Sequence, residues 1–265
     1  MSEWRHFRSV RRFFDRSAPR YEEVASVQTR TARDLLERLT LAEEPLRILD
    51  AGCGSGILTR MLLDRFPRSR VDALDVSERM LEVARSRTPS DRVRWIQSDF
   101  AHYTPSLTYP LIVSNASLHW APNLEEAIRN LAECLAPGGL LAVSLMVRGT
   151  LRELKACLQM VVAGKPPPGD LPEIEEVLLA TDQSGLVREA CGTYEVIQRY
   201  GSAMEVLHTL HVQGLTGGTR FRPSAPLVRS ELSALMREYD RIFAHPDGGV
   251  TATYAVGWVC ARRPT

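Results

Sequence analysis

LRILDAGCGSG, residues 46–56, is an apolar run that ends in an acid and passes into a turn with glycine at every second position. The apolar run predicts a buried parallel strand. Glycines let the chain turn sharply and let a ligand approach the backbone closely. Residues 57–66 have helical spacing, so the turn opens onto a helix N-terminus. Together these features indicate the nucleotide-binding corner of a doubly wound α/β domain.

The loop after this strand distinguishes three classes of ligand. A P-loop requires Gly-Lys-Ser/Thr, but here Gly56 is followed by Ile57. A dinucleotide fold requires G-x-G-x-x-G, whereas Gly52, Gly54 and Gly56 follow a shorter G-x-G-x-G spacing. With Asp50 leading into it, the loop resembles motif I of the S-adenosylmethionine-dependent methyltransferases of Rossmann-like fold. A glycine-rich turn that binds no ligand is the weaker alternative.

The second predicted strand, residues 71–76, brings another acid to the same edge of the sheet. Asp75 comes about 20 residues after the loop, where a Rossmann-type fold places the carboxylate that accepts from the ribose hydroxyls. Ser77 is a helix-capping residue type, and we expect it to cap a helix over residues 78–87. The resemblance implies that Met80 in this helix packs on adenine, although ordinary core packing explains it equally well.

The third and fourth predicted strands end in polar residues too. Residues 93–100 form a strand that ends in Asp99 and Phe100, and the resemblance implies that Asp99 binds the adenine amino group beside the Phe100 backbone. The end of the strand over residues 111–116 is implied to lie under the methionine moiety, with Asn115 in contact. Four strand ends in the family's order predict S-adenosylmethionine as the cofactor.

Composition restricts the class of protein. The 265 residues carry a net charge of +1 and are 44% hydrophobic, so we expect a sizeable core and neither a nucleic-acid nor a membrane partner. No secretory signal is recognisable, and the scattered, odd-numbered cysteines favour reduced thiols in the cytoplasm. His208 and His211 lie one helical turn apart without a third ligand nearby, so we expect no metal.

The predicted fold is α/β: a Rossmann-like, seven-stranded, mostly parallel sheet with an antiparallel edge strand, a helical N-terminal segment and a helical lid insertion. Residues 1–45 are expected to form an N-terminal helical cover, and residues 46–265 the methyltransferase domain. The lid insertion is placed at about residues 201–249, between two strands at residues 187–200 and 250–261 that pair antiparallel at the sheet edge.

Two local boundaries are predicted from breaker residues. Pro137-Gly138-Gly139 should end a helix over residues 123–135 and lead into a strand at residues 140–146. The proline-rich stretch at residues 164–169 reads as a stiff linker.

A more specific resemblance extends over nearly the whole chain. Residues 12–22 (RFFDRSAPRYE), 115–120 (NASLHW), 149–154 (GTLREL) and 250–254 (VTATY) resemble the malonyl-acyl-carrier-protein O-methyltransferases of biotin biosynthesis. The resemblance implies transfer of a methyl group from S-adenosylmethionine to the free carboxylate of a malonyl thioester. The carrier is acyl-carrier protein or coenzyme A, and the product is the methyl ester that starts pimeloyl synthesis.

Two departures keep alternatives open. His119 stands where that family is expected to have Gln, and residues 204–211 differ from its usual lid segment. The nearest rival is trans-aconitate methyltransferase, a small-molecule carboxyl methyltransferase with a similar segment before Trp120. A further alternative is a regulator that binds the cofactor without catalysis, but the glycines and acids of the cofactor site are all intact.

The acceptor side of the site is predicted to contain orienting residues only. A carboxylate is already ionised at neutral pH, so we expect no general base and no catalytic residue in that sense. Tyr21 is a candidate to hydrogen-bond the substrate, and Trp120 to wall the pocket, with core packing as the alternative for both. Arg148 or Arg152 is a candidate partner for the carboxylate, unless both are simply solvated.

The first helix carries a concentration of positive charge. Acyl-carrier proteins are acidic as a class, so a basic helix near the pocket mouth is predicted to guide the carrier to the site. A solvated basic face is the common alternative. The arginines of this helix are Arg5, Arg8, Arg11, Arg12 and Arg16.

Overall fold

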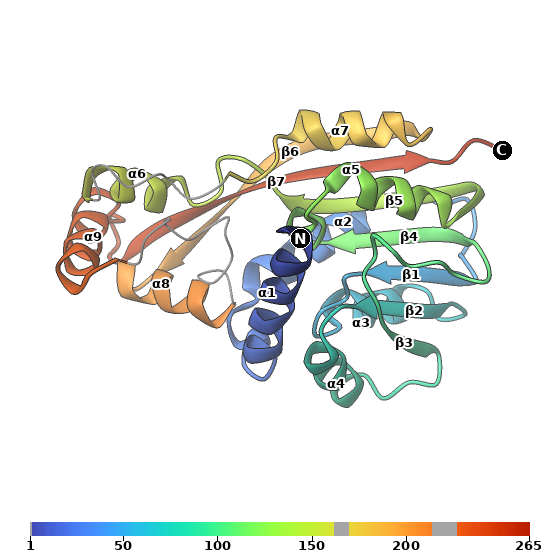
Figure 1. Ribbon diagram of the computed structural model, residues 1–265, viewed down its shortest axis with the longest axis horizontal. Coiled ribbons are helices and arrows are strands. Elements are labelled where there is room, and N and C mark those ends of the chain that lie inside the picture. Colours follow the sequence, from blue (N-terminus) through green and yellow to red (C-terminus); the bar gives the residue numbers. More distant parts are fainter. Residues whose placement is uncertain (1, 162–169, 214–226) are drawn as a thin grey trace.

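The computed structural model describes residues 2–161, 170–213 and 227–265, and this part is built around a seven-stranded sheet (Figure 1). The strand order is β3-β2-β1-β4-β5-β7-β6, in which the chain steps first to one side of β1 and then to the other. This is the order of a doubly wound fold. The strands are β1 Arg47–Ala51, β2 Arg70–Asp75, β3 Val93–Gln97, β4 Tyr109–Asn115, β5 Leu135–Met146, β6 Val187–Tyr200 and β7 Val250–Arg262.

Helices cover both faces of this sheet (Figure 1). Successive residues of β1 point to opposite faces: Ile48 packs with α2 and α3, and Leu49 packs with α5 and α7. The helices are α1 Ser2–Ser17, η1 Tyr21–Val24, α2 Ser26–Glu37, α3 Ile57–Arg65, α4 Glu78–Arg87, η2 Leu118–Trp120, α5 Leu124–Glu133, α6 Arg152–Val161, α7 Ile174–Gln183, α8 Ala203–Val212 and α9 Arg229–Ile242.

The predicted fold class is confirmed. β1 to β5 pair in parallel, β7 runs antiparallel to both β5 and β6, and β6 forms the edge. β6 and β7 have 14 and 13 residues, and their pairing continues past the last residue of β5 to Tyr200 and Val250. The predicted insertion at residues 201–249 starts from this extension and contains α8 and α9. The predicted linker at residues 164–169 lies outside the described residues.

One predicted boundary is wrong. Pro137-Gly138-Gly139 does not precede the fifth strand but lies inside β5, which starts at Leu135, and helix α5 ends at Glu133. Leu135 pairs with Tyr109, and the register with β4 then shifts before Leu140. A Cβ on Gly139 would lie 2.8–2.9 Å from two backbone oxygens, so the glycine allows this irregularity within a strand.

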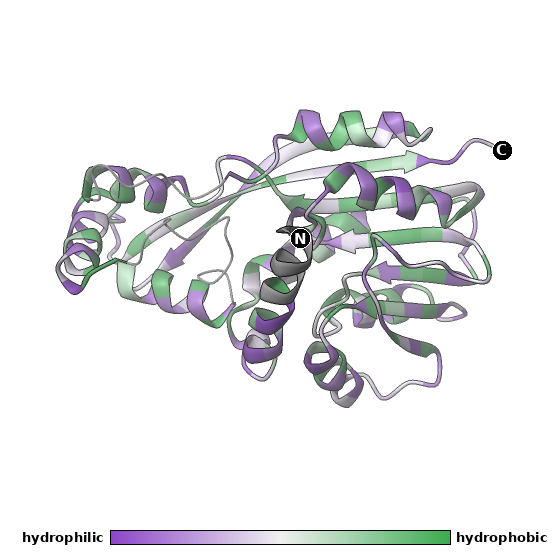
Figure 2. Cartoon of the chain, in the orientation of Figure 1, coloured by the Kyte–Doolittle hydropathy of each residue, from purple (hydrophilic) through white to green (hydrophobic). Residues whose placement is uncertain are grey.

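Apolar side chains fill the centre of the sheet. Figure 2 shows β4 and β5 as largely hydrophobic, whereas α5 also carries hydrophilic residues. This matches a parallel sheet covered on both faces, with polar residues left for the outer sides of the helices. None of the described helices is long and apolar enough to cross a bilayer.

A polar cluster joins four strands in the half of the sheet that lies away from the carboxyl ends of the strands. Asp72 is buried in β2 and accepts from Tyr109 Oη at 2.6 Å, from Arg47 Nη2 at 3.0 Å and from Arg94 Nε at 2.9 Å. Burial alone would raise the pKa of Asp72, but the hydrogen bonds from Arg94, Tyr109 and Arg47 outweigh it and lower the pKa. The charged form of Asp72 therefore stabilises the folded chain.

Replacing Asp72 with Asn should lower the free energy of unfolding by about 1–3 kcal/mol, because three donors lose a charged acceptor. Urea unfolding at pH 7, followed by circular dichroism, measures the loss. Since the folded-state pKa is lowered, the difference from wild type should be complete above the unfolded-state pKa of about 3.9 and should shrink as the pH falls through the lower, folded-state pKa.

Asp64→Asn is the matched control, because Asp64 lies exposed on α3. It should change the free energy of unfolding by less than about 0.5 kcal/mol. Equal losses in the two variants would contradict a stabilising role for the Asp72 cluster.

Candidate active site

The glycine loop after β1 folds back against the end of β2. The N–H groups of Gly52 and Cys53 both donate to the Leu74 carbonyl oxygen, at 2.7 and 2.9 Å. Gly52 and Gly54 have φ angles of +79° and +53°, a region that favours glycine. A Cβ on Gly52 would lie 1.9 Å from Ser117 Oγ. Glycine is therefore what allows the loop to sit between the ends of β1, β2 and β4.

Asp75 is held at the end of β2 by two backbone donors. Its Oδ2 accepts from Gly54 N at 2.9 Å and its Oδ1 from Ser77 N at 2.8 Å. Burial raises the pKa of Asp75 to about 6, against the lowering effect of these two hydrogen bonds, and the charge of Asp15 raises it further. Asp75 is therefore mainly ionised at neutral pH and gains a proton as the pH falls through about 6.

The Ser77 cap is confirmed: Ser77 Oγ accepts from Met80 N at 3.1 Å and starts α4. The same hydroxyl donates to Asp15 Oδ1 of α1 at 2.7 Å. One serine therefore connects the N-terminal segment to the start of α4, directly after the carboxylate of Asp75.

Asp50 is a second buried acid at this edge of the sheet. Its Oδ2 accepts from Thr59 Oγ1 at 2.6 Å, while Oδ1 has no hydrogen-bond partner among the described residues. Burial raises the pKa of Asp50 to about 7, the Thr59 hydrogen bond lowers it, and the charge of Asp75 raises it further. A ligand with a positively charged hydrogen-bond donor would provide the partner that Asp50 Oδ1 lacks.

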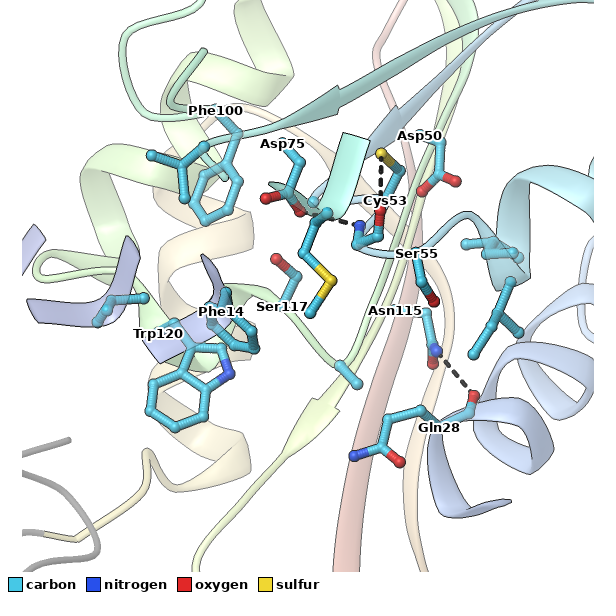
Figure 3. A pocket seen from close by; sticks show the side chains of 18 of the residues that line it. Phe14, Gln28, Asp50, Cys53, Ser55, Asp75, Phe100, Asn115, Ser117 and Trp120 are labelled. Carbon is cyan, nitrogen blue, oxygen red and sulfur yellow. Dashed lines mark hydrogen bonds between the residues drawn. The ribbon is translucent and has the colours of Figure 1, made fainter. Parts of the chain in front are cut away.

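The ends of β3 and β4 complete this edge. Asp99 Oδ1 accepts from Ala101 N at 2.9 Å, which fixes the turn that carries Phe100. Asn115 accepts from Ser144 Oγ at 2.6 Å and donates through Nδ2 to the Gln28 carbonyl oxygen at 3.0 Å (Figure 3). The Asn115 side chain is therefore oriented from both sides.

The N-terminal cover, residues 1–45, is fastened to the sheet domain by an ion-pair clamp. Glu22 of η1 pairs with Arg60 of α3 and with Arg87 of α4, both at 3.0 Å. Burial alone would raise the pKa of Glu22, but the hydrogen bonds and charges around it lower it, so it stays ionised at neutral pH. The clamp holds η1, in the middle of the cover, beside the glycine loop, since Arg60 also donates to Ser55 O.

Aromatic rings from the cover meet η2 above the strand ends. The ring of Phe14 lies edge-on to Trp120 with centroids 5.6 Å apart, and to Tyr21 at 6.4 Å. Burial, together with the nearby charge of Asp75, raises the pKa of Tyr21 above its ordinary value. The Tyr21 hydroxyl therefore keeps its proton and is available as a donor.

These groups surround one cavity, whose empty space, open mouth included, is about 910 Å³ (Figure 3). The structure brings together here all of the predicted site residues except Gly56, Arg148 and Arg152, the last of which pairs with Glu195. The predicted residues in the lining are Tyr21, Asp50, Gly52, Gly54, Asp75, Met80, Asp99, Phe100, Asn115 and Trp120.

Gly56 and Arg148 are not brought to the cavity. Gly56 is the N-cap of α3, with φ +85°, and a Cβ there would lie 3.2 Å from that of Ala84. The Arg148 side chain is half exposed and pairs with Glu173 at 2.8 Å and with Asp170 at 3.8 Å. These acids compete for the guanidinium that was predicted to hold a substrate carboxylate.

A second, smaller cavity adjoins the first behind Tyr21 and Trp120, which line both. Its described lining is aromatic or neutral, apart from His119, and contains no Asp, Glu, Lys or Arg. The lining residues are Phe14, Tyr21, Gln28, Ala116, His119, Trp120, Met146, Thr150, Gln213 and Tyr254.

Several residues that line the two cavities carry no role predicted from the sequence. Ser117 lies two residues after Asn115, in the NASLHW segment that carries the resemblance. The motif could therefore have indicated that Ser117 lies at the site. Gln28 follows the N-terminal motif closely. Gln213 had no local signal, because its contact with Val24 spans 189 residues.

Comparison with known proteins identifies the family. A family model described as a methyltransferase domain matches residues 48–139. Malonyl-acyl-carrier-protein O-methyltransferase of Halorhodospira halophila is 33% identical over 94% of this chain and 85% of its own length. Trans-aconitate 2-methyltransferase of Methylobacterium nodulans is 32% identical over 94% of this chain and 98% of its own length.

The chain belongs to the S-adenosylmethionine-dependent methyltransferases of Rossmann-like fold. Among solved structures, a phosphoethanolamine N-methyltransferase of Haemonchus contortus shares the fold at a TM-score of 0.60 and 15% identity, over 96% of this chain and 60% of that one. The matching domain and the relatives named as methyltransferases assign the chain to the S-adenosylmethionine-dependent enzymes of this family.

The residues of the first cavity fit S-adenosylmethionine. Asp50 Oδ1 is a buried acceptor without a described partner, and the glycine loop leaves room for a ligand beside it. We propose that Asp75 would accept from the ribose hydroxyls and that Asp50 would face the amino group of the methionine moiety. Met80, Asp99 and Phe100 would surround the adenine.

Asp75→Ala should weaken the binding of S-adenosylmethionine at least about tenfold, because each hydrogen bond to a charged acceptor contributes roughly 1.5–3 kcal/mol. Titration calorimetry measures the affinity. Asp91→Ala, an exposed acid before β3, is the control and should bind as wild type does. Wild-type affinity in a folded Asp75→Ala variant would contradict the assignment.

The same titrations at lower pH test whether the negative charge of Asp75 contributes to cofactor binding. Affinity of the wild type should fall as the pH drops through about 6, where Asp75 gains a proton. Asp75→Asn carries no titratable group at this position and should lose that part of the pH dependence.

Proposed function

We propose that this methyltransferase acts on the free carboxylate of a malonyl thioester carried by acyl-carrier protein and forms its methyl ester. A relative that covers nearly the whole chain carries the name of this activity. A relative of almost equal identity is named for trans-aconitate. Sequence identity therefore does not distinguish between the two acceptors. The residues that line the second cavity provide the distinction.

The absence of Lys and Arg from the described lining of the second cavity carries the proposal. Burying a charge is costly unless an opposite charge or several hydrogen bonds compensate for it. A malonyl thioester brings one carboxylate, which the single positive charge of the cofactor's sulfonium balances. Trans-aconitate brings three carboxylates, and the described lining offers no Lys or Arg to the other two. The cavity therefore favours the acceptor with one charge.

The chain's own residues position the acceptor and exclude water. When bound, S-adenosylmethionine supplies a methyl group on a positively charged sulfur. A carboxylate needs no base to become a nucleophile at neutral pH, so the protonated Tyr21 acts as a hydrogen-bond donor. The rings of Phe14 and Trp120 pack beside Tyr21 and exclude water from this part of the site. Positioning of this kind contributes roughly 7–11 kcal/mol in good cases.

Mass spectrometry of malonyl-acyl-carrier protein incubated with enzyme and S-adenosylmethionine tests this function. We expect a mass gain of one methyl group on the free carboxyl, and no change in acetyl-acyl-carrier protein, which lacks that carboxylate. Asp75→Ala, assayed in parallel, is expected to be nearly inactive. Faster turnover of trans-aconitate than of malonyl-acyl-carrier protein would favour the rival acceptor.

Carrier docking is the second part of the proposal. Arg12 and Arg16 are exposed on α1, whose Phe14 lines both cavities, so they lie near the pocket. Arg11 is paired with Asp15 at 3.7 Å. The side chains of Arg5 and Arg8 lie outside the described residues. Exposed positive charge at this position is suited to steering an acidic carrier protein.

Arg12→Glu and Arg16→Glu should each lower kcat/KM for malonyl-acyl-carrier protein more than for malonyl-CoA, because only the protein carrier presents an acidic surface. Added salt should reduce the difference, since exposed charges are screened within about 10 Å at 0.1 M. Arg70→Glu, an exposed arginine at the start of β2, is the control. Equal losses on the two substrates would indicate a role of the helix in folding instead.

A further inference from the structure

Gln213 is a buried amide on the wall of the second cavity. It is the C-cap residue of α8, and its backbone N–H donates to Thr209 O at 2.9 Å. Only 1% of the residue is exposed, although it lies at the end of a surface helix. The Gln213 side chain therefore reaches inward from α8, toward the N-terminal cover.

Hydrogen bonds fix which end of this amide is nitrogen. Nε2 donates to Val24 O at 2.8 Å and lies 3.5 Å from Gln28 Oε1. Both of these oxygens are acceptors, so the atom that faces them has to be the donor nitrogen. The remaining atom, Gln213 Oε1, is a buried acceptor with no partner among the described residues.

Two other polar groups of the cavity, on Thr150 and Tyr254, already have partners. Thr150 Oγ1 donates to Ala255 O and accepts from Ala255 N, both at 3.0 Å. The Tyr254 hydroxyl shares a hydrogen bond of 2.8 Å with Tyr200. An unpaired buried oxygen is costly, and a molecule in the cavity that Gln213 lines would remove this cost by donating a hydrogen bond to it.

The reacting carboxylate cannot be that donor, because it is ionised and has only acceptor atoms. We propose that Gln213 Oε1 accepts a hydrogen bond from an amide N–H in the arm of the acyl thioester. The arms of acyl-carrier protein and coenzyme A both contain such amides. This inference rests on the proposed function and adds a specificity determinant to it: the enzyme recognises the arm as well as the acyl group.

A pair of small thioesters isolates this one hydrogen bond. The first is malonyl-N-acetylcysteamine, which carries an amide N–H two carbons from sulfur. The second is its ester counterpart, in which an oxygen replaces the N–H. Wild-type enzyme should show a kcat/KM about five- to tenfold higher for the amide, since 1.4 kcal/mol corresponds to a factor of ten.

Gln213→Leu should use the two thioesters equally, within about twofold, because it has no acceptor left to distinguish them. The ratio within one variant is insensitive to a general loss of stability. Gln213→Met provides the same test if the Leu variant does not fold. Gln183→Leu, at the exposed end of α7, should keep the wild-type ratio.

Three results would overturn the inference. Equal use of the two thioesters by the wild type would show that the amide is not recognised. A wild-type ratio in Gln213→Leu would show that another group recognises it. Methylation of neither thioester by the wild type, with turnover of trans-aconitate, would overturn the proposed function and the inference together.

Discussion

The carboxylate of Asp75 is the constraint on which the site depends. Its two oxygens accept from Gly54 N and Ser77 N, and so join the loop after β1 to the start of α4. Through the Ser77 hydroxyl the connection continues to Asp15 of α1. A buried carboxylate is tolerated only with such donors, so the loop, the helix cap and the N-terminal cover have to be in place together.

The two cavities differ in the charged residues of their lining, and this difference fits the separate tasks proposed for them. The first is lined by Asp50, Asp75 and Asp99, and burial raises the pKa of Asp50 to about 7 and of Asp75 to about 6. A cationic ligand relieves the cost of keeping such acids ionised. The described lining of the second cavity contains no Asp, Glu, Lys or Arg. The first cavity therefore suits a positively charged methyl donor. The second cavity suits the proposed acceptor, which has a single negative charge.

Sequence patterns predicted the parts of the site that depend on local structure. Asp50, Asp75 and Asn115 end strands that an apolar run and a turn define, and parallel strands bring their carboxyl ends to one edge. Gln213 was missed because its partner Val24 is 189 residues away. The bulge at Pro137–Gly139 was missed for a similar reason, since it depends on pairing with Tyr109 of β4. Local breaker residues carry no information about such a partner.

The two cavities draw part of their lining from different segments of the chain. The methyltransferase domain matches residues 48–139, which contain every strand end of the first cavity. Tyr21, Gln28 and Gln213, which line the second, lie outside that range and come from the cover and from α8. Glu22 fastens the cover to α3 and α4, while Gln213 connects it to α8. The acceptor proposed above is therefore tested most directly by substitutions in these two outer segments.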